Sequence, residues 1–358
     1  MRTSSKLYAG IAVMAISLYA QAYPGESIVR DPATGNYTIT YQGDSNTTEL
    51  SQTIFVPSTK IDPVIRSGFR LGENGVIVYR YTVSNGATAK QAIVSVVLEQ
   101  IVNPILGETP SPDQLPNITQ ADLDAYVAAE ASALASPAGW NGDITRSIPN
   151  IGWSPNTATY NTGGIHAGRT LSGFGFNSLD LPGVGPSWMA GLVGDNEIFG
   201  FPDDGPLKDS AIFAQLNQLR DNNFVSRPAA VPTIAVPSPF DPAVTLNRIQ
   251  TQMHTWIAMQ LLDATFSAQL DRYFQSAISA YGLNQNKVGK KHIQTMRDLI
   301  KKEQPDADRE DGNDDRGKKG DDDDKNKTKH ALIDKLAARI LDFDLSYVTK
   351  RMGGNKDD

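Results

Sequence analysis

The stretch "GVIVYRYTVSNGATAKQAIVSVVLEQ", residues 75–100, has the clearest secondary-structure pattern in the chain and decides the expected fold. In residues 76–84 every second side chain is apolar, which is typical of a strand with one buried face. That apolar face holds Ile77, Tyr79, Tyr81 and Val83. Residues 92–101 form a second alternating run, with Val94, Val96 and Leu98 on one face. We expect the two strands to pair across a loop of several residues or a bulge, because the apolar pattern does not resume directly after Asn85-Gly86.

Similar short runs surround this stretch. Between Asn36 and Leu192 the sequence is rich in Val, Ile, Tyr and Thr, punctuated by Gly, Pro, Asn and Ser. Further strands are expected at residues 37–41, 54–56, 169–177 and 188–193. Short, regularly spaced strands with one buried face predict a β-sandwich.

Residues 75–98, together with the later segment "LSGFGFNSLDLPG" at 171–183, resemble the immunoglobulin-like modules of exported bacterial proteins. The resemblance covers less than half of the chain. It implies an immunoglobulin-like β-sandwich and transfers no functional residue.

A helix is expected inside this β-rich part, at residues 119–134. Thr119 and Asp122 have the spacing of an N-cap and its third helical residue, and Leu123, Tyr126, Val127 and Leu134 fall on one face. The inserted helix either shapes a binding edge or simply covers an exposed sheet edge.

The second half of the chain changes character at a proline-rich stretch, residues 227–242. Its prolines remove backbone donors, so we expect an interdomain linker without a helix or an interior strand. Apolar residues then recur at spacings of three and four, which predicts helices at 242–281 with one break, 288–303 and 329–350. The charged run at residues 305–329 lacks the apolar side chains needed for a core, so it is expected to be a disordered spacer.

The first 22 residues have the pattern of a signal peptide. A basic start with Arg2 and Lys6 is followed by an apolar run and by Ala20-Gln21-Ala22, which predicts cleavage after Ala22. The alternative is an uncleaved membrane anchor, but the run is shorter than the roughly 20 residues that span a bilayer. We therefore expect a bacterial exported protein, periplasmic or extracellular, without a transmembrane anchor after cleavage.

Composition narrows the possible partners. The 358 residues carry a formal net charge of -7, which argues against binding nucleic acid, because phosphates are neutralised by an excess of Lys and Arg. The chain has no cysteine, so its core must be stable without disulfides.

Metal sites are not predicted. In the acidic run, an EF-hand loop starting at Asp311 would place Gly317 one position late and Asp322 where a glutamate is needed. The four histidines, at 166, 254, 292 and 330, show no zinc-ligand spacing, and we expect His254 to be a partly buried, hydrogen-bonded core residue.

Catalytic and nucleotide-binding motifs are also missing from the sequence. Ser187 lacks the second glycine of a nucleophile elbow, and no glycine-rich phosphate loop is present, so no cofactor is expected. Four aromatic residues have the right chemistry to stack on sugars, although aromatics near Gly and Pro are more often core residues. They are Trp140, Trp153, Tyr160 and Trp188.

The sequence thus predicts a β plus α protein of two domains. A signal peptide at 1–22 precedes an immunoglobulin-like β-sandwich at 23–226, a linker at 227–242 and a small helical domain at 243–358. The expected function is non-enzymatic binding or structural support, with a protein or polysaccharide partner outside the cytoplasm. The alternative is a secreted, glycosidase-like hydrolase whose carboxylates are dispersed in the sequence. No catalytic residue is predicted.

Overall fold

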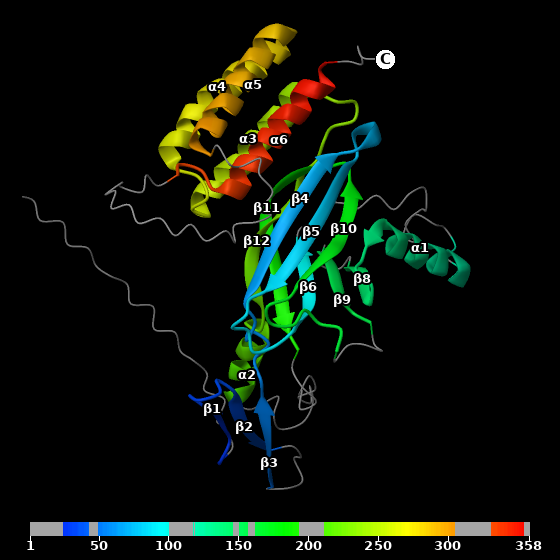
Figure 1. Ribbon diagram of the computed structural model, residues 1–358, viewed down its shortest axis with the longest axis vertical. Helices are drawn as coiled ribbons and strands as arrows, with labels where there is room; N and C mark the ends of the chain where they lie inside the picture. Colours follow the sequence, from blue (N-terminus) through cyan, green and yellow to red (C-terminus); the bar gives the residue numbers. More distant parts are fainter. Residues whose placement is uncertain are drawn as a thin grey trace, which may run out of the picture. The chain divides into compact units, whose positions relative to one another are not determined.

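The structure is a computed structural model, and it describes residues 24–42, 49–99, 117, 119–145, 150–156, 162–192, 211–304 and 331–353. The described residues form three antiparallel sheets and six α-helices, so the prediction of a β plus α protein is confirmed (Figure 1). The expected signal peptide at 1–22 and the expected spacer at 305–329 lie outside the described residues.

The chain divides into two compact units, each described here by itself. One consists of Met1–Pro57 and Val193–Asn223, and the other of Ser58–Leu192 and Phe224–Asp358. The C-terminal helices therefore belong to the same unit as the two larger sheets. The predicted domain boundary in the proline-rich stretch is not confirmed.

The first unit contains a small sheet and one helix. Its sheet has the order β1-β2-β3, formed by β1 (Ser27–Arg30), β2 (Tyr37–Gln42) and β3 (Leu50–Phe55). The helix is α2 (Ala211–Asp221). Ile39 and Phe55 pack with Ile212 and Leu216 in a core of their own. The strands expected at 37–41 and 54–56 are thus present as β2 and the end of β3.

The second unit is built on two sheets. The four-stranded sheet has the order β4-β5-β10-β7, with β4 (Pro63–Leu71), β5 (Ile77–Asn85), β7 (Leu134–Ala135) and β10 (Thr170–Ser178). The five-stranded sheet has the order β12-β11-β6-β9-β8. Its strands are β6 (Ile93–Glu99), β8 (Trp140–Thr145), β9 (Asn150–Pro155), β11 (Leu181–Gly191) and β12 (Val225–Ile234).

The alternation read from residues 76–84 identifies the buried face correctly. Ile77, Tyr79, Tyr81 and Val83 of β5 are all buried, together with Val96 and Leu98 of β6. Tyr81 and Phe174 meet Trp153 of the facing sheet at ring-centroid distances of 6.4 and 5.7 Å. The inner faces of the two sheets therefore share one aromatic-rich core.

The expected pairing of the two strands in the opening stretch is wrong. β5 pairs with β4 and β10, whereas β6 pairs with β11 and β9 in the other sheet. The reason lies in the connection between them, whose backbone amides bond to other segments. Lys90 N donates to Lys60 O at 2.9 Å, Ile93 N donates to Ile165 O at 3.0 Å, and the Asn85 side chain also donates to Ile165 O at 2.9 Å. The chain thus crosses between sheets here, and it crosses again from β10 to β11.

The proline-rich stretch also differs from the expected linker, because its first part is β12. Proline has no backbone N–H to donate. Pro228 and Pro232 are tolerated because β12 is an edge strand, so one side of its backbone has no neighbouring strand to pair with. The exclusion of an interior strand holds, but the stretch is paired to β11 from Val225 to Ile234.

The helices follow the sequence pattern closely. α1 (Gln120–Ala133) begins with the predicted capping box, in which the Asp122 amide donates to Thr119 Oγ1 and the Thr119 amide donates to Asp122 Oδ2. α1 contacts β7, which follows it directly, and β8, but Leu123 of its expected apolar face is exposed and Leu134 lies in β7, so neither role expected of the inserted helix is shown. The others are α3 (Pro242–Ala258), α4 (Ala264–Gly282), α5 (Asn286–Glu303) and α6 (Lys335–Arg351).

Helices α3 to α6 lie together at one end of the two larger sheets (Figure 1). α6 contacts α3, α5, β11 and β12, so it joins the helices to the sheets. A bidentate pair between Arg297 of α5 and Asp342 of α6, at 2.7 and 2.9 Å, fixes the two helices to each other. Among the described residues, no helix has both the length and the apolar character to span a bilayer.

Candidate functional site

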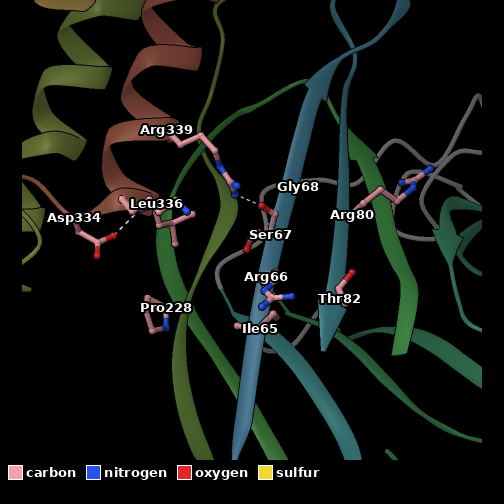
Figure 2. Close-up of a pocket in the computed structure, with 11 residues that line it drawn as sticks. Ile65, Arg66, Ser67, Gly68, Arg80, Thr82, Pro228, Asp334, Leu336 and Arg339 are labelled. Atoms are coloured by element: carbon pink, nitrogen blue, oxygen red, sulfur yellow. Dashed lines mark hydrogen bonds between the residues drawn. The ribbon is translucent and has the colours of Figure 1, made fainter. Parts of the chain in front are cut away.

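A groove of about 500 Å³ lies beside the edge strand β4, next to the start of α6 (Figure 2). Its lining comes from β4, β5, β12 and α6: Ile65, Arg66, Ser67, Gly68, Arg80, Thr82, Pro228, Asp334, Lys335, Leu336 and Arg339. Four of these side chains are basic and one is acidic, so the groove carries net positive charge.

Arg339 fixes the start of α6 to the edge of β4 (Figure 2). Its Nη2 atom donates to the carbonyl oxygen of Ser67, and its guanidinium lies 5.0 Å from the centre of the Phe69 ring. Phe343, about one helical turn later, meets the same ring edge-on at 5.1 Å. This wall of the groove is therefore held by both polar and aromatic contacts.

β12 secures the same edge of β4 from another side. The amide of Ala230 donates to Ser67 Oγ at 2.9 Å, and Arg227 Nε donates to the carbonyl oxygen of Pro63 at 2.9 Å. The carbonyl oxygens of Pro63 and Ser67 are therefore already occupied. An exposed edge strand is a template for adding another strand, and these contacts block that template on β4.

The single acid of the groove, Asp334, is used to cap α6. Its Oδ1 accepts from the amide of Leu336 at 2.8 Å and more weakly from that of Ala337 at 3.4 Å. These bonds satisfy two of the amides that a helix start leaves without partners. Asp334 thus has a structural role that accounts for its position.

The groove opens onto the outer face of β4, β5 and β10, which we call the arginine face. Arg66 lies opposite Thr82 and Arg70 opposite Val78, and Arg80 is the diagonal neighbour of both arginines. Such diagonal neighbours are roughly 7–8 Å apart. No Asp or Glu occurs in any of these three strands. Three positive charges therefore share one face without an acid between them.

Arg80 is exposed, but its guanidinium also contacts the backbone of β5 and β10. Its Nη1 donates to the carbonyl oxygen of Tyr79 at 2.7 Å and reaches that of Phe176 at 3.5 Å. A Cβ atom at Gly175 would lie 2.8 Å from Arg80 Cδ and 2.3 Å from the Tyr79 oxygen. Burial, and next the charge of Arg70, lower the pKa of Arg80, but a guanidinium stays protonated at neutral pH.

Hydroxyl groups line the same face beyond the arginines. Thr82 Oγ1 and Ser172 Oγ lie 3.0 Å apart, and Ser84 Oγ and Thr170 Oγ1 lie 2.8 Å apart across the β5–β10 pair. Each hydroxyl both donates and accepts, so these pairs can exchange one bond for a bond to a ligand hydroxyl.

The chemistry of this face is anion recognition. Arg66 and Arg70 are exposed, and neither makes a hydrogen bond or ion pair with any residue in the described ranges. A guanidinium presents two parallel N–H groups that match the two oxygens of a carboxylate. The sequence pattern placed Arg80 on the polar face of its strand, but it did not reveal β4, which brings Arg66 and Arg70 beside it.

The aromatic residues considered for sugar stacking are used elsewhere. Trp140 and Trp153 are buried, and their indole nitrogens donate to the carbonyl oxygens of Gly163 and Ala135, each at 3.1 Å. Trp188 is partly buried and donates to Glu99 Oε2 at 2.7 Å. Tyr160 lies outside the described residues. The three tryptophans that the structure describes do not form an exposed stacking surface.

The three histidines in the described ranges do not form a metal site either. His254 Nε2 lies 2.8 Å from Asp271 Oδ1, but its side chain is 47% exposed, so the expectation of a core residue is wrong. It bridges α3 and α4 at the surface of the helices. His330 and the acidic run around Asp311 lie outside the described residues. Within the part that the structure describes, no three His, Asp or Glu side chains gather as metal ligands.

One buried acid escaped the sequence analysis entirely. Asp344 of α6 is 0% exposed, and neither of its carboxyl oxygens has a hydrogen-bond partner among the described residues. Burial raises the pKa of Asp344 well above its usual range. The signal was its place among the apolar residues of the final helix. Because it is fully enclosed, it cannot touch a substrate.

No protein-family model, curated protein or solved structure matches this chain.

Proposed function

We propose that this is an exported, non-enzymatic binding protein whose ligand, a polymer or protein outside the cytoplasm, contacts the arginine face. The observation that carries the proposal is the cluster of Arg66, Arg70 and Arg80 on strands without any acid. Like charges at close range repel one another, so an unneutralised cluster of this kind costs stability. A bound anion removes that cost.

The fold proposed for the β-rich part is an immunoglobulin-like sandwich. Two features support it: antiparallel sheets that share a core around Trp153, and a chain that changes sheet between β5 and β6 and again between β10 and β11. On this proposal the helices α3 to α6 buttress one end of the sandwich, with α6 as the docking element.

The competing proposal is a hydrolase. A glycosidase needs two carboxyl groups in one cleft, roughly 5 to 9 Å apart. The groove described above has only Asp334, which caps α6, and Asp344 is enclosed. Binding therefore has the stronger support.

A capture experiment tests the proposal. The full chain, immobilised, is exposed to the envelope fraction and culture fluid of the host, and the Arg66→Gln, Arg70→Gln double variant serves as the matched control. We expect a polymer or protein that the wild type retains and the variant loses. Turnover of a glycan by the wild type would instead favour the hydrolase.

Mass spectrometry of the exported protein checks the cleavage after Ala22, and intact residues 1–22 would contradict export with cleavage.

A further inference from the structure

The nature of the ligand can be narrowed from the chemistry of the arginine face. We propose that this face binds an acidic polysaccharide whose sugars carry carboxylates, that is, a polyuronate. The inference rests on the proposed binding function and assigns its ligand class. It uses three features: the charges, the hydroxyl pairs and the occupied edge of β4.

The charges favour a ligand whose anionic groups repeat along a chain, as the carboxylates of a polyuronate do. Arg66 and Arg70 lie on one strand, each diagonal to Arg80, so they form a row along the sheet and not a single pocket. The groove beside them is open at the surface of β4 and β5 (Figure 2). A polyuronate has one carboxylate on each sugar, and an extended chain of that kind can meet successive guanidinium groups, each in a two-bond geometry.

The hydroxyl pairs favour a sugar backbone between the carboxylates. Ser172 and Thr170 are exposed on β10, and their partners Thr82 and Ser84 lie beside the arginines on β5. Sugar hydroxyls donate and accept, and so do these side chains.

The edge of β4 argues against an extended acidic peptide. Peptides commonly bind a sheet by adding a strand to a free edge, where main-chain hydrogen bonds supply the affinity. Here the carbonyl oxygens of Pro63 and Ser67 already accept from Arg227 and Arg339. An acidic peptide would have to bind through side chains alone, without the backbone ladder.

The test measures binding of the full chain to polygalacturonate by isothermal titration calorimetry at about 0.1 M ionic strength, where charges are screened beyond about 10 Å. We expect binding that weakens about tenfold in Arg66→Gln and in Arg70→Gln, the loss of one charge-assisted contact. Arg66→Lys should fall between wild type and Arg66→Gln, because it keeps the charge but loses the fork. Arg272→Gln, an exposed arginine on α4, alters the net charge equally and should leave affinity unchanged.

Other polymers separate the alternatives. Tighter binding of polyglutamate would overturn the inference in favour of an acidic protein, and tighter binding of dextran sulfate or polyphosphate in favour of another anion. Equal binding of neutral dextran, or an equal loss in Arg272→Gln, would also overturn it. If polygalacturonate fails to bind while the capture experiment still yields a partner lost in the double variant, the inference fails and the proposed function stands. If both experiments are negative, both fail.

Discussion

The hydroxyl group of Tyr81 donates a hydrogen bond of 2.7 Å to the carbonyl oxygen of Ala230, joining β5 to β12 through the core. The amide of Ala230 donates in turn to Ser67 Oγ of β4. The backbone of Ala230 thus accepts a hydrogen bond from β5 and donates one to β4, two neighbouring strands of the facing sheet. Burial raises the pKa of Tyr81 well above its usual range, so the hydroxyl keeps its proton.

Replacing Tyr81 by Phe should destabilise the second unit by about 1–2 kcal/mol, because the buried carbonyl oxygen of Ala230 loses its donor. Urea denaturation of the full chain, followed by tryptophan fluorescence, measures the change. Tyr281→Phe is the matched control: its hydroxyl is buried and has no partner in the part of the chain that the structure describes, so removing it should be neutral or stabilising. Equal losses in both variants would contradict this account.

Gly175→Ala should be strongly destabilising, by about 1–3 kcal/mol, because the new methyl group meets the backbone oxygen of Tyr79. Gly68 flanks Arg80 on the opposite side, and a Cβ there would lie 3.6 Å from the nearest atom, an ordinary contact. Gly68→Ala should therefore be neutral or stabilising by about 0.5 kcal/mol. Thermal unfolding of the two variants makes the comparison, and a tolerated Gly175→Ala would show that the strands can move apart.

Asp344→Asn should stabilise the protein, and increasingly so as the pH rises above about 4. The folded-state pKa of Asp344 is raised above the ordinary value of 3.8. Below pH 3.8 the carboxyl is therefore protonated in both the folded and the unfolded state, and it does not change the free energy of unfolding. As the pH rises further, the unfolded chain ionises and the folded one does not. Wild-type stability then falls by at most about 1.4 kcal/mol per pH unit, until the folded-state pKa is passed.

Denaturation midpoints of wild type and Asp344→Asn between pH 4 and pH 8 check this sign. If the difference between the two midpoints does not change between pH 4 and pH 8, Asp344 has a hydrogen-bonding or charged partner in solution. Asp342→Asn provides the contrast two residues away, since it breaks a bidentate pair with Arg297 and should cost about 2 kcal/mol.

The alternation of Ile77, Tyr79, Tyr81 and Val83 was enough to predict which face of β5 is buried, because the side-chain period of a strand is local. The capping box of Thr119 and Asp122 predicted the start of α1 for the same reason. Strand partners are not local. A loop of several residues after Asn85-Gly86 was expected to connect two paired strands, yet the backbone bonds with Lys60 and Ile165 direct the chain to another sheet.

The arginine face shows the same limit for the candidate site. Arg80 was visible as a polar residue on a predicted strand, whereas Arg66 and Arg70 lie on β4, which has a weaker pattern because Ser67 and Gly68 interrupt its apolar residues. Their proximity to Arg80 depends on the β4–β5 register. Asp344 was hidden by the apolar stripe around it, since a helical pattern predicts burial but not whether a buried acid finds a partner.

The bond between Arg339 and Ser67 joins residues that lie 272 positions apart in the sequence. A ribosome makes β4 long before α6, so during synthesis the edge of β4 and the ring of Phe69 lack the partners that α6 supplies. A nascent or prematurely ended chain therefore offers an open strand to its neighbours, and such chains are prone to aggregate. A holding chaperone would be needed to cover this edge only until α6 has been made and has docked onto β4.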